Sequence, residues 1–192
     1  IKNVGMSMSK KSVSVEHMQE EWLEVQAAQK DPAMFRPLYE RYHEPIYIYI
    51  FRRTTDEMLT ADLCSQVFLK AMQKIHRYEY QGVPFSAWLY RIASNEIAQH
   101  FRKANKTRVV TIEDAPLSHL SEEIGREIPE DLTPLLVQAL DSLKEEDLQI
   151  IELRFFEERP YKEVGEVLGI TENYAKVKTF RILNRIKKNL GE

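Results

Sequence analysis

The sequence predicts an all-α protein with two small helical domains joined by a flexible acidic linker. Apolar residues recur at three- and four-residue spacing through most of the chain, and no apolar–polar alternation is long enough to build a sheet. This periodicity stops over residues 111–131, where acidic residues outnumber basic ones seven to one and proline and glycine interrupt any long helix. We therefore expect a first domain at 15–105, a linker at 106–131 and a second domain at 132–190.

The first domain is expected to contain four helices around one core. The first spans 15–30, and Pro32 opens the second at a first-turn position. Pro45 lies inside the second segment and is expected to kink it or shift its start. Asp56 begins the third, which carries an apolar stripe with Asp62, Ser65, Gln66 and Leu69 beside it, available to a partner. The stripe consists of Leu59, Leu63, Val67, Ala71 and Ile75.

The fourth helix is predicted over 85–104 and follows an aromatic, turn-forming connection at residues 76–84. Its inner side is marked by Ser86, Trp88, Leu89, Ile92, Ala93, Ile97 and Phe101. Its basic face carries Arg91, Asn95, Arg102 and Lys103. Stacking a base on an aromatic ring contributes roughly 1–3 kcal/mol, so a rim formed by Tyr78 and Tyr80 suits the capture of unpaired bases. Trp88 is better explained as a core residue, because it lies on the apolar stripe.

Residues 161–188 read as a short helix, a tight turn and a longer basic helix. Gly169 ends the first helix and Thr171 is the expected N-cap of the second. A core-facing stripe is formed by Ala175, Thr179, Ile182, Ile186 and Leu190. The predicted DNA-reading residues are Thr171, Glu172, Asn173, Tyr174, Val177, Lys178 and Arg181. Cations favour any helix C-terminus, so a merely basic tail is the alternative; the preceding helix and glycine turn favour a helix-turn-helix.

Composition narrows the class of protein further. The 192 residues are 43% hydrophobic and 30% charged, and the net charge of -3 argues against bulk electrostatic coating of nucleic acid. The linker acidity is either solubilising, or it keeps the two basic domains off each other and mimics nucleic acid inside a basic channel. No apolar run is long enough to cross a membrane and no signal peptide is recognised, so we expect a cytoplasmic protein without membrane insertion. Cys64 is the single cysteine, expected to be a buried thiol.

An enzyme is the main competing class, and its signals are weak. Glu40 and His43 form one E-x-x-H on a helix, but a di-iron bundle needs a second copy, which the sequence lacks. No phosphate-binding loop, dinucleotide fingerprint or nucleophile motif is present. We therefore predict no catalytic residues, no metal site and no cofactor.

Four segments together resemble bacterial extracytoplasmic-function, or group IV, sigma factors of RNA polymerase. Residues 35–54 (FRPLYERYHEPIYIYIFRRT) and 60–75 (TADLCSQVFLKAMQKI) resemble the opening and polymerase-binding helices of sigma region 2. Residues 84–103 (PFSAWLYRIASNEIAQHFRK) resemble its promoter-melting and minus-ten helix, and residues 142–188 resemble region 4. Two blocks in the right order make this far more specific than a lone helix-turn-helix.

The resemblance implies a non-catalytic transcription initiation factor. Asp62 matches the acidic residue of the family's Asp-Leu motif, which implies docking on the clamp helices of the largest polymerase subunit. The resemblance further implies that residues 76–84 and 91–103 meet the minus-ten element. Region 4 would then read the minus-thirty-five element and rest on the flap of the second-largest subunit. Ser65 and Gln66 depart from the family's frequent Gln-Glu pair, which affects the details of polymerase docking. Tyr174 and Val177 replace the usual recognition-helix residues, which affects the choice of promoter bases.

The sequence leaves open one other function and the mode of regulation. A transcription activator with a helical sensing domain also fits a helix-turn-helix, and it differs by binding its duplex site without polymerase. Regulation of a sigma factor by an anti-sigma factor is the natural hypothesis, because no additional sensory domain is recognised; control through expression alone is its alternative.

Overall fold

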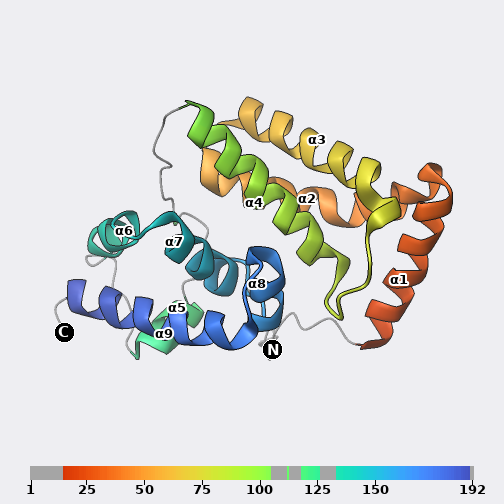
Figure 1. Cartoon of the computed structure of the whole chain (residues 1–192). Coiled ribbons are helices and arrows are strands. Elements are labelled where there is room, and N and C mark those ends of the chain that lie inside the picture. Colours follow the sequence, from red (N-terminus) through yellow and green to blue (C-terminus); the bar gives the residue numbers. More distant parts are fainter. Residues whose placement is uncertain (1–14, 105–111, 113–117, 126–132, 191–192) are drawn as a thin grey trace, which may run out of the picture.

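The computed structural model describes residues 15–104, 112, 118–125 and 133–190, and over this part of the chain it contains helices and turns but no strand (Figure 1). The predicted all-α class is confirmed. The helices are α1 (Val15–Lys30), α2 (Arg36–Thr54), α3 (Glu57–Lys74), α4 (Phe85–Ala104), α5 (Ser118–Ile124), α6 (Thr133–Asp141), α7 (Glu145–Ile151), α8 (Tyr161–Leu168) and α9 (Glu172–Asn189). A π-helical turn, Glu152–Phe156, follows α7.

Polar side chains cap two helix starts, of which the one at Asp56 was predicted. The carboxylate of Asp31 accepts a hydrogen bond from the Ala33 amide, and that of Asp56 accepts one from the Leu59 amide. Asp31 caps the short 3₁₀ turn Pro32–Phe35 that leads into α2. Helix α2 starts nine residues before Pro45 and runs through it, so the proline does not set the start of the helix.

Helices α1–α4 form the N-terminal bundle, and their apolar stripes meet in its core. The predicted stripe is buried from Leu63 on α3 to Ile75 in the 3₁₀ turn that follows, while Leu59 at its start packs against the core and stays partly exposed. Tyr49 of α2 is fully buried, and its hydroxyl lies 2.6 Å from the Ser94 hydroxyl of α4. This bond satisfies two buried polar groups and fixes α2 against α4.

Helices α6–α9 form the C-terminal domain. All five residues of the predicted α9 stripe are buried, as expected for the inner face of an amphipathic helix. The region predicted as linker also contains α5, which packs on α9 and buries Leu120 and Ile124. A seven-residue helix in an acidic context is too short to give a clear periodic signal, which explains why the sequence did not reveal it.

The two domains touch one another, an arrangement that the sequence did not predict. Helix α8 of the C-terminal domain packs along α4 of the bundle, and the segment between α7 and α8 meets the end of α2 (Figure 1). Helix α3 lies on the far side of the bundle from the C-terminal domain.

Candidate nucleic-acid and polymerase interfaces

The turn between α8 and α9 is fixed by two glycines and one hydroxyl. Gly169 adopts φ 68°, the left-handed conformation that ends α8. The Thr171 hydroxyl accepts a hydrogen bond from the Tyr174 amide at 3.1 Å and so caps α9. At Gly165 a Cβ would lie 2.7 Å from the Ile170 carbonyl oxygen, so only glycine lets α8 approach the turn this closely. The predicted helix-turn-helix geometry is present.

The outer face of α9 carries the predicted DNA-reading residues, and most are exposed. Tyr174 and Val177 are 51% and 43% exposed, and Thr171, Glu172, Asn173 and Arg181 are also exposed. A groove of about 570 Å³ runs along this face. Its lining includes Asn173, Tyr174, Val177, Lys178 and Arg181. Amide, aromatic and guanidinium groups on one helix edge suit contacts with base edges and phosphates in a major groove.

Lys178 differs from the other members of this face because it is bound to acidic residues of α7. Its ammonium lies 3.1 Å from the Asp147 carboxylate and 3.3 Å from that of Glu146. Burial lowers the pKa of Lys178. Hydrogen bonds to Asp147 and Glu146 raise it and together outweigh burial, so the net shift is upward. The side chain therefore links α9 to α7, in addition to any contact with DNA.

The predicted partner-binding residues of α3 form a second surface. Asp62, Ser65 and Gln66 are exposed, and Leu69 is 56% exposed. Met72, one turn further, is 44% exposed. An apolar pair of this kind beside acidic and polar groups suits a protein interface.

The loop at 76–84 corrects one expectation. Tyr78 was expected on the rim of a base-binding pocket, but it is only 8% exposed. Its ring packs at 5.2 Å from Phe85, 5.0 Å from Trp88 and 6.2 Å from Trp22, and burial raises the pKa of its hydroxyl. The hydrophobic gain of burying a large ring between three others outweighs exposure in a loop. Tyr80 is 42% exposed with its ring 5.9 Å from Trp22, and its contact with bases stays a prediction.

Helix α1 holds this loop in place, a role that the sequence did not reveal. The Gln29 side-chain amide donates to the carbonyls of Ile75 at 3.0 Å and Tyr78 at 2.8 Å. The buried Glu21 carboxylate accepts a hydrogen bond from the Phe85 amide at 2.7 Å, which caps the start of α4, and another from the Tyr42 hydroxyl. A polar residue on the inner face of an amphipathic helix was the available signal, but the groups of the loop and of α4 that it binds lie 46 to 64 residues away in the chain.

One residue of the basic face of α4, Arg91, lies next to the C-terminal domain. Arg91, Asn95, Arg102 and Lys103 are all exposed. The Arg91 guanidinium lies 3.5 Å from the Glu166 carboxylate of α8. The structure thus brings part of the predicted minus-ten face beside the helix-turn-helix.

Two other kinds of feature are absent from the described residues, a metal-binding cluster and a membrane-spanning helix. Among residues 15–104, 112, 118–125 and 133–190, no group of three His, Cys, Asp or Glu side chains is arranged to hold a metal ion. Within the same residues, no helix combines the length and the apolar character needed to cross a membrane.

Comparison with known families assigns both domains. The family model of Sigma-70 region 2 matches residues 38–107, and that of Sigma-70, region 4 matches residues 139–188. Together the two matches cover more than half of the chain. It belongs to the sigma-70 family of RNA polymerase sigma factors.

The relatives place the chain within this family. It is 29% identical to the ECF RNA polymerase sigma factor BldN of Streptomyces coelicolor over 160 residues, which span 82% of this chain and 61% of BldN. It is also 29% identical to the ECF RNA polymerase sigma factor SigM of Bacillus subtilis, over 78% of this chain and 91% of SigM. The chain is thus an extracytoplasmic-function member of the family.

Two solved structures share the fold. One is CnrH in complex with the cytosolic domain of CnrY, with a TM-score of 0.58 and 16% identity over 88% of this chain and 95% of that one. The other is the sigma factor RpoE in complex with the anti-sigma factor NepR from Bartonella quintana, with a TM-score of 0.54 and 18% identity over 81% of this chain and 96% of that one. At these identities the likeness concerns the fold alone.

Proposed function

We propose that this chain is an alternative sigma factor that binds core RNA polymerase, directs it to specific promoters and assists promoter opening. The observation that carries the proposal is the combination of an exposed reading edge on α9 with a separate region 2 bundle. The bundle bears an apolar and polar patch on α3 and an aromatic loop beside a basic helix. A transcription initiation factor needs these surfaces for polymerase, unpaired bases and duplex DNA.

Each surface has a proposed partner. The α3 patch of Asp62, Ser65, Gln66 and Leu69 docks on the clamp helices of the largest polymerase subunit. The loop and the basic face of α4, with Tyr80, Arg91, Asn95, Arg102 and Lys103, engage the minus-ten element. The exposed edge of α9 enters the major groove at minus thirty-five, while the C-terminal domain rests on the flap of the second-largest subunit. Tyr78 supports the loop from inside, because its ring is buried.

The test is in-vitro transcription with core polymerase. Promoter-dependent initiation is expected from a genomic template library when the chain is added, and no specific start without it. Active core polymerase that yields no chain-dependent start on any template would overturn the proposal. A primary sigma factor on its own promoter is the positive control for the core enzyme.

A duplex-binding activator is the second candidate, favoured by the exposed α9 edge. The two candidates differ in their need for polymerase. An activator binds a specific duplex tightly by itself and adds nothing to purified core enzyme, whereas a sigma factor confers specific starts on it.

We also propose control by an anti-sigma factor, since two fold neighbours were solved with a partner, CnrY and the anti-sigma factor NepR. Affinity purification of the tagged chain from its native cell tests this, and recovery of polymerase without any small partner would contradict it.

A further inference from the structure

The exposed ring of Tyr80 rests on helix α1. The centre of this ring lies 5.9 Å from that of Trp22, with 35° between the two ring planes. The Tyr80 hydroxyl donates to the sulfur of Met18 at 3.7 Å. Both partners belong to α1, so the loop alone does not orient the Tyr80 side chain.

One side of α1 follows the loop along its length. Met18, Trp22 and Gln29 are spaced by four and seven residues, which places them on the same side of the helix. Gln29 binds two backbone carbonyls at the start of the loop, within residues 75–78. Trp22 and Met18 then hold the ring of Tyr80. Helix α1 is therefore a continuous support for the loop.

Trp22 connects the exposed ring to the aromatic core. Trp22 is partly buried, and its ring lies 6.2 Å from that of Tyr78, which packs against Phe85 and Trp88. Burial of apolar surface explains the positions of these inner rings. It does not explain Tyr80, which is the outermost ring and is 42% exposed. A ring that is both exposed and fixed in orientation suits a ligand that stacks on it.

The separation of the two outer rings decides where a flat ligand can lie. A base inserted between two aromatic rings needs roughly 7 Å between them, twice the 3.4 Å spacing of stacked bases. The centres of the Trp22 and Tyr80 rings are 5.9 Å apart, which is too close. A base therefore stacks on the open side of Tyr80, with Trp22 behind that ring as its support.

Cations at one end of this surface favour a nucleic acid over a protein as the ligand. Lys30 lies in the last turn of α1, Lys74 in the last turn of α3 and Arg77 in the 3₁₀ turn that follows, and all three are exposed. The contact of Gln29 with this turn brings the two helix ends together. Glu79 is the only acidic residue in the sequence 75–84. Exposed cations beside a stacking ring fit the phosphates and bases of a single strand.

We infer that Trp22 is a positioning residue of the minus-ten site. It fixes the Tyr80 ring so that an unpaired base stacks on the open side of that ring, while Lys30, Lys74 and Arg77 bind phosphates of the same strand. The inference deepens the proposed function and rests on it for the promoter. It adds α1 to the site, a helix that lies outside residues 38–107 matched by the region 2 model.

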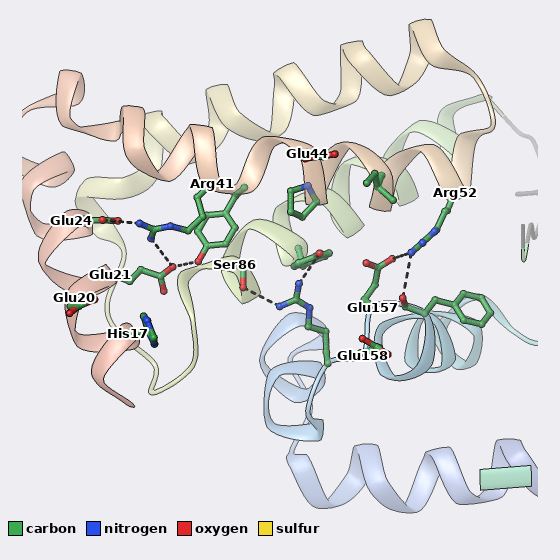
Figure 2. A pocket seen from close by; sticks show the side chains of 16 residues that line it. His17, Glu20, Glu21, Glu24, Arg41, Glu44, Arg52, Ser86, Glu157 and Glu158 are labelled. Carbon is green, nitrogen blue, oxygen red and sulfur yellow. Dashed lines mark hydrogen bonds and ion pairs between the residues drawn. The ribbon is translucent and has the colours of Figure 1, made fainter. Parts of the chain in front are cut away.

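Helix α1 is anchored to α2 on a side away from Trp22. Arg41 of α2 lies 2.8 Å from the Glu24 carboxylate and 3.7 Å from that of Glu21 (Figure 2). These three side chains line part of a cleft of about 790 Å³ whose lining does not include Trp22. A substitution at Trp22 therefore changes the support of Tyr80 without releasing α1.

Paired substitutions test the positioning role in the complex with core polymerase. Trp22→Leu removes the ring and keeps an apolar side chain, and it should reduce permanganate reactivity of promoter thymines about threefold to tenfold. In a Tyr80→Ala background the same change should have less than about a twofold effect, because the ring that Trp22 positions is gone. Trp22→Phe keeps a ring and should restore most of the opening. Leu23→Ala is the matched control, since Leu23 is 66% exposed on the same helix, and it should leave opening unchanged.

A photochemical crosslink locates the base without any substitution, so it applies even where Trp22→Leu weakens the fold. The non-template strand carries 5-iodouracil in place of each minus-ten thymine in turn. With the wild-type chain and core polymerase, we expect one of these positions to crosslink to Tyr80, identified by mass spectrometry of the digested chain. Lys30→Gln should leave this crosslink in place and reduce the salt slope of binding to the single-stranded minus-ten oligonucleotide by about 0.7.

The outcomes separate this inference from the proposed function. Equal effects of Trp22→Leu with and without Tyr80, or no crosslink to Tyr80 on a promoter that opens, would overturn the inference and leave the sigma factor assignment intact. Weaker binding of Trp22→Leu to core polymerase, with normal opening once bound, would overturn it too and show that the ring pair contacts protein. Absence of promoter-dependent transcription by the wild-type chain would overturn the proposed function, and this inference with it.

Discussion

The two candidate DNA surfaces are built in different ways. On α9, the side chains predicted to read bases lie on the outer face, while a separate stripe on the same helix holds the domain together. In the bundle, the loop at 76–84 begins in a short 3₁₀ turn, Ile75–Arg77, and is held by α1, by the buried Tyr78 ring and by the start of α4. On a single helix, the residues that read bases can differ from those that hold the fold together. A loop surface instead depends on distant residues for its shape. Substitutions in the two places should therefore differ in kind.

The largest expected effect is at Tyr78. Truncating a buried aromatic side chain typically costs about 3–5 kcal/mol, so Tyr78→Ala should lower the unfolding free energy of the bundle by that order. Thermal unfolding followed by circular dichroism measures it. Tyr80→Ala, on the exposed neighbour, should leave the unfolding temperature nearly unchanged and reduce promoter opening, reported by permanganate reactivity of promoter thymines. Equal stability losses at the two positions would contradict the difference in burial.

The next effect concerns the turn of the helix-turn-helix. Gly165→Ala places a methyl group against the Ile170 carbonyl and should cost about 1–3 kcal/mol or more, with loss of minus-thirty-five binding. Gly169→Asn is the matched control, because asparagine tolerates the left-handed conformation and the site has space. Duplex binding and chemical denaturation of both variants check the prediction. Similar binding by the two would show that the turn relaxes without cost.

On the reading face itself, Arg181→Ala should weaken duplex binding without loss of stability. A lost bidentate base contact costs roughly 1–3 kcal/mol and relaxes preference at one promoter position, while a lost phosphate contact reduces the salt slope by about one. Lys178→Ala should weaken binding and also lower stability, because Asp147 loses one of its two cationic partners. Titrations at several salt concentrations separate the cases. Loss of core polymerase binding by Arg181→Ala would show that this face has a different partner.

The smallest effect is expected at Gln29. Gln29→Met keeps the length of the side chain but removes both donors to the loop, and each hydrogen bond contributes about 0.5–1.5 kcal/mol. Hydrogen exchange of the loop amides should quicken, and promoter opening should fall by a factor of a few. Hydrogen exchange of residues 76–84 and permanganate reactivity measure the two effects. Unchanged hydrogen exchange of residues 76–84 in Gln29→Met would show that α1 does not hold the loop.

Sequence patterns predicted what depends on neighbours along the chain. The α9 stripe, the Thr171 cap and the Gly169 turn all follow from spacing within one or two helical turns, and all were confirmed. The support of the loop by Gln29 and the burial of Tyr78 depend on residues from other helices, which periodicity cannot locate. The ion pair between Arg53 and Glu152 could not be predicted either, because both residues look like ordinary surface charges until their helices meet.

The position of helix α5 sets the length of the connection between the two domains. With α5 seated on α9, the connection from Ala104 to Ser118 is about 14 residues, which covers roughly 50 Å when fully stretched at 3.6 Å per residue. Release of α5 would bring the residues up to Thr133 into the connection and about double that reach. We therefore expect the spacing between promoter elements that the protein tolerates to depend on the stability of this one short helix. The tolerated spacing can be measured by transcribing templates whose spacer is lengthened a few base pairs at a time. The wild-type chain and Leu120→Ala would be compared on these templates.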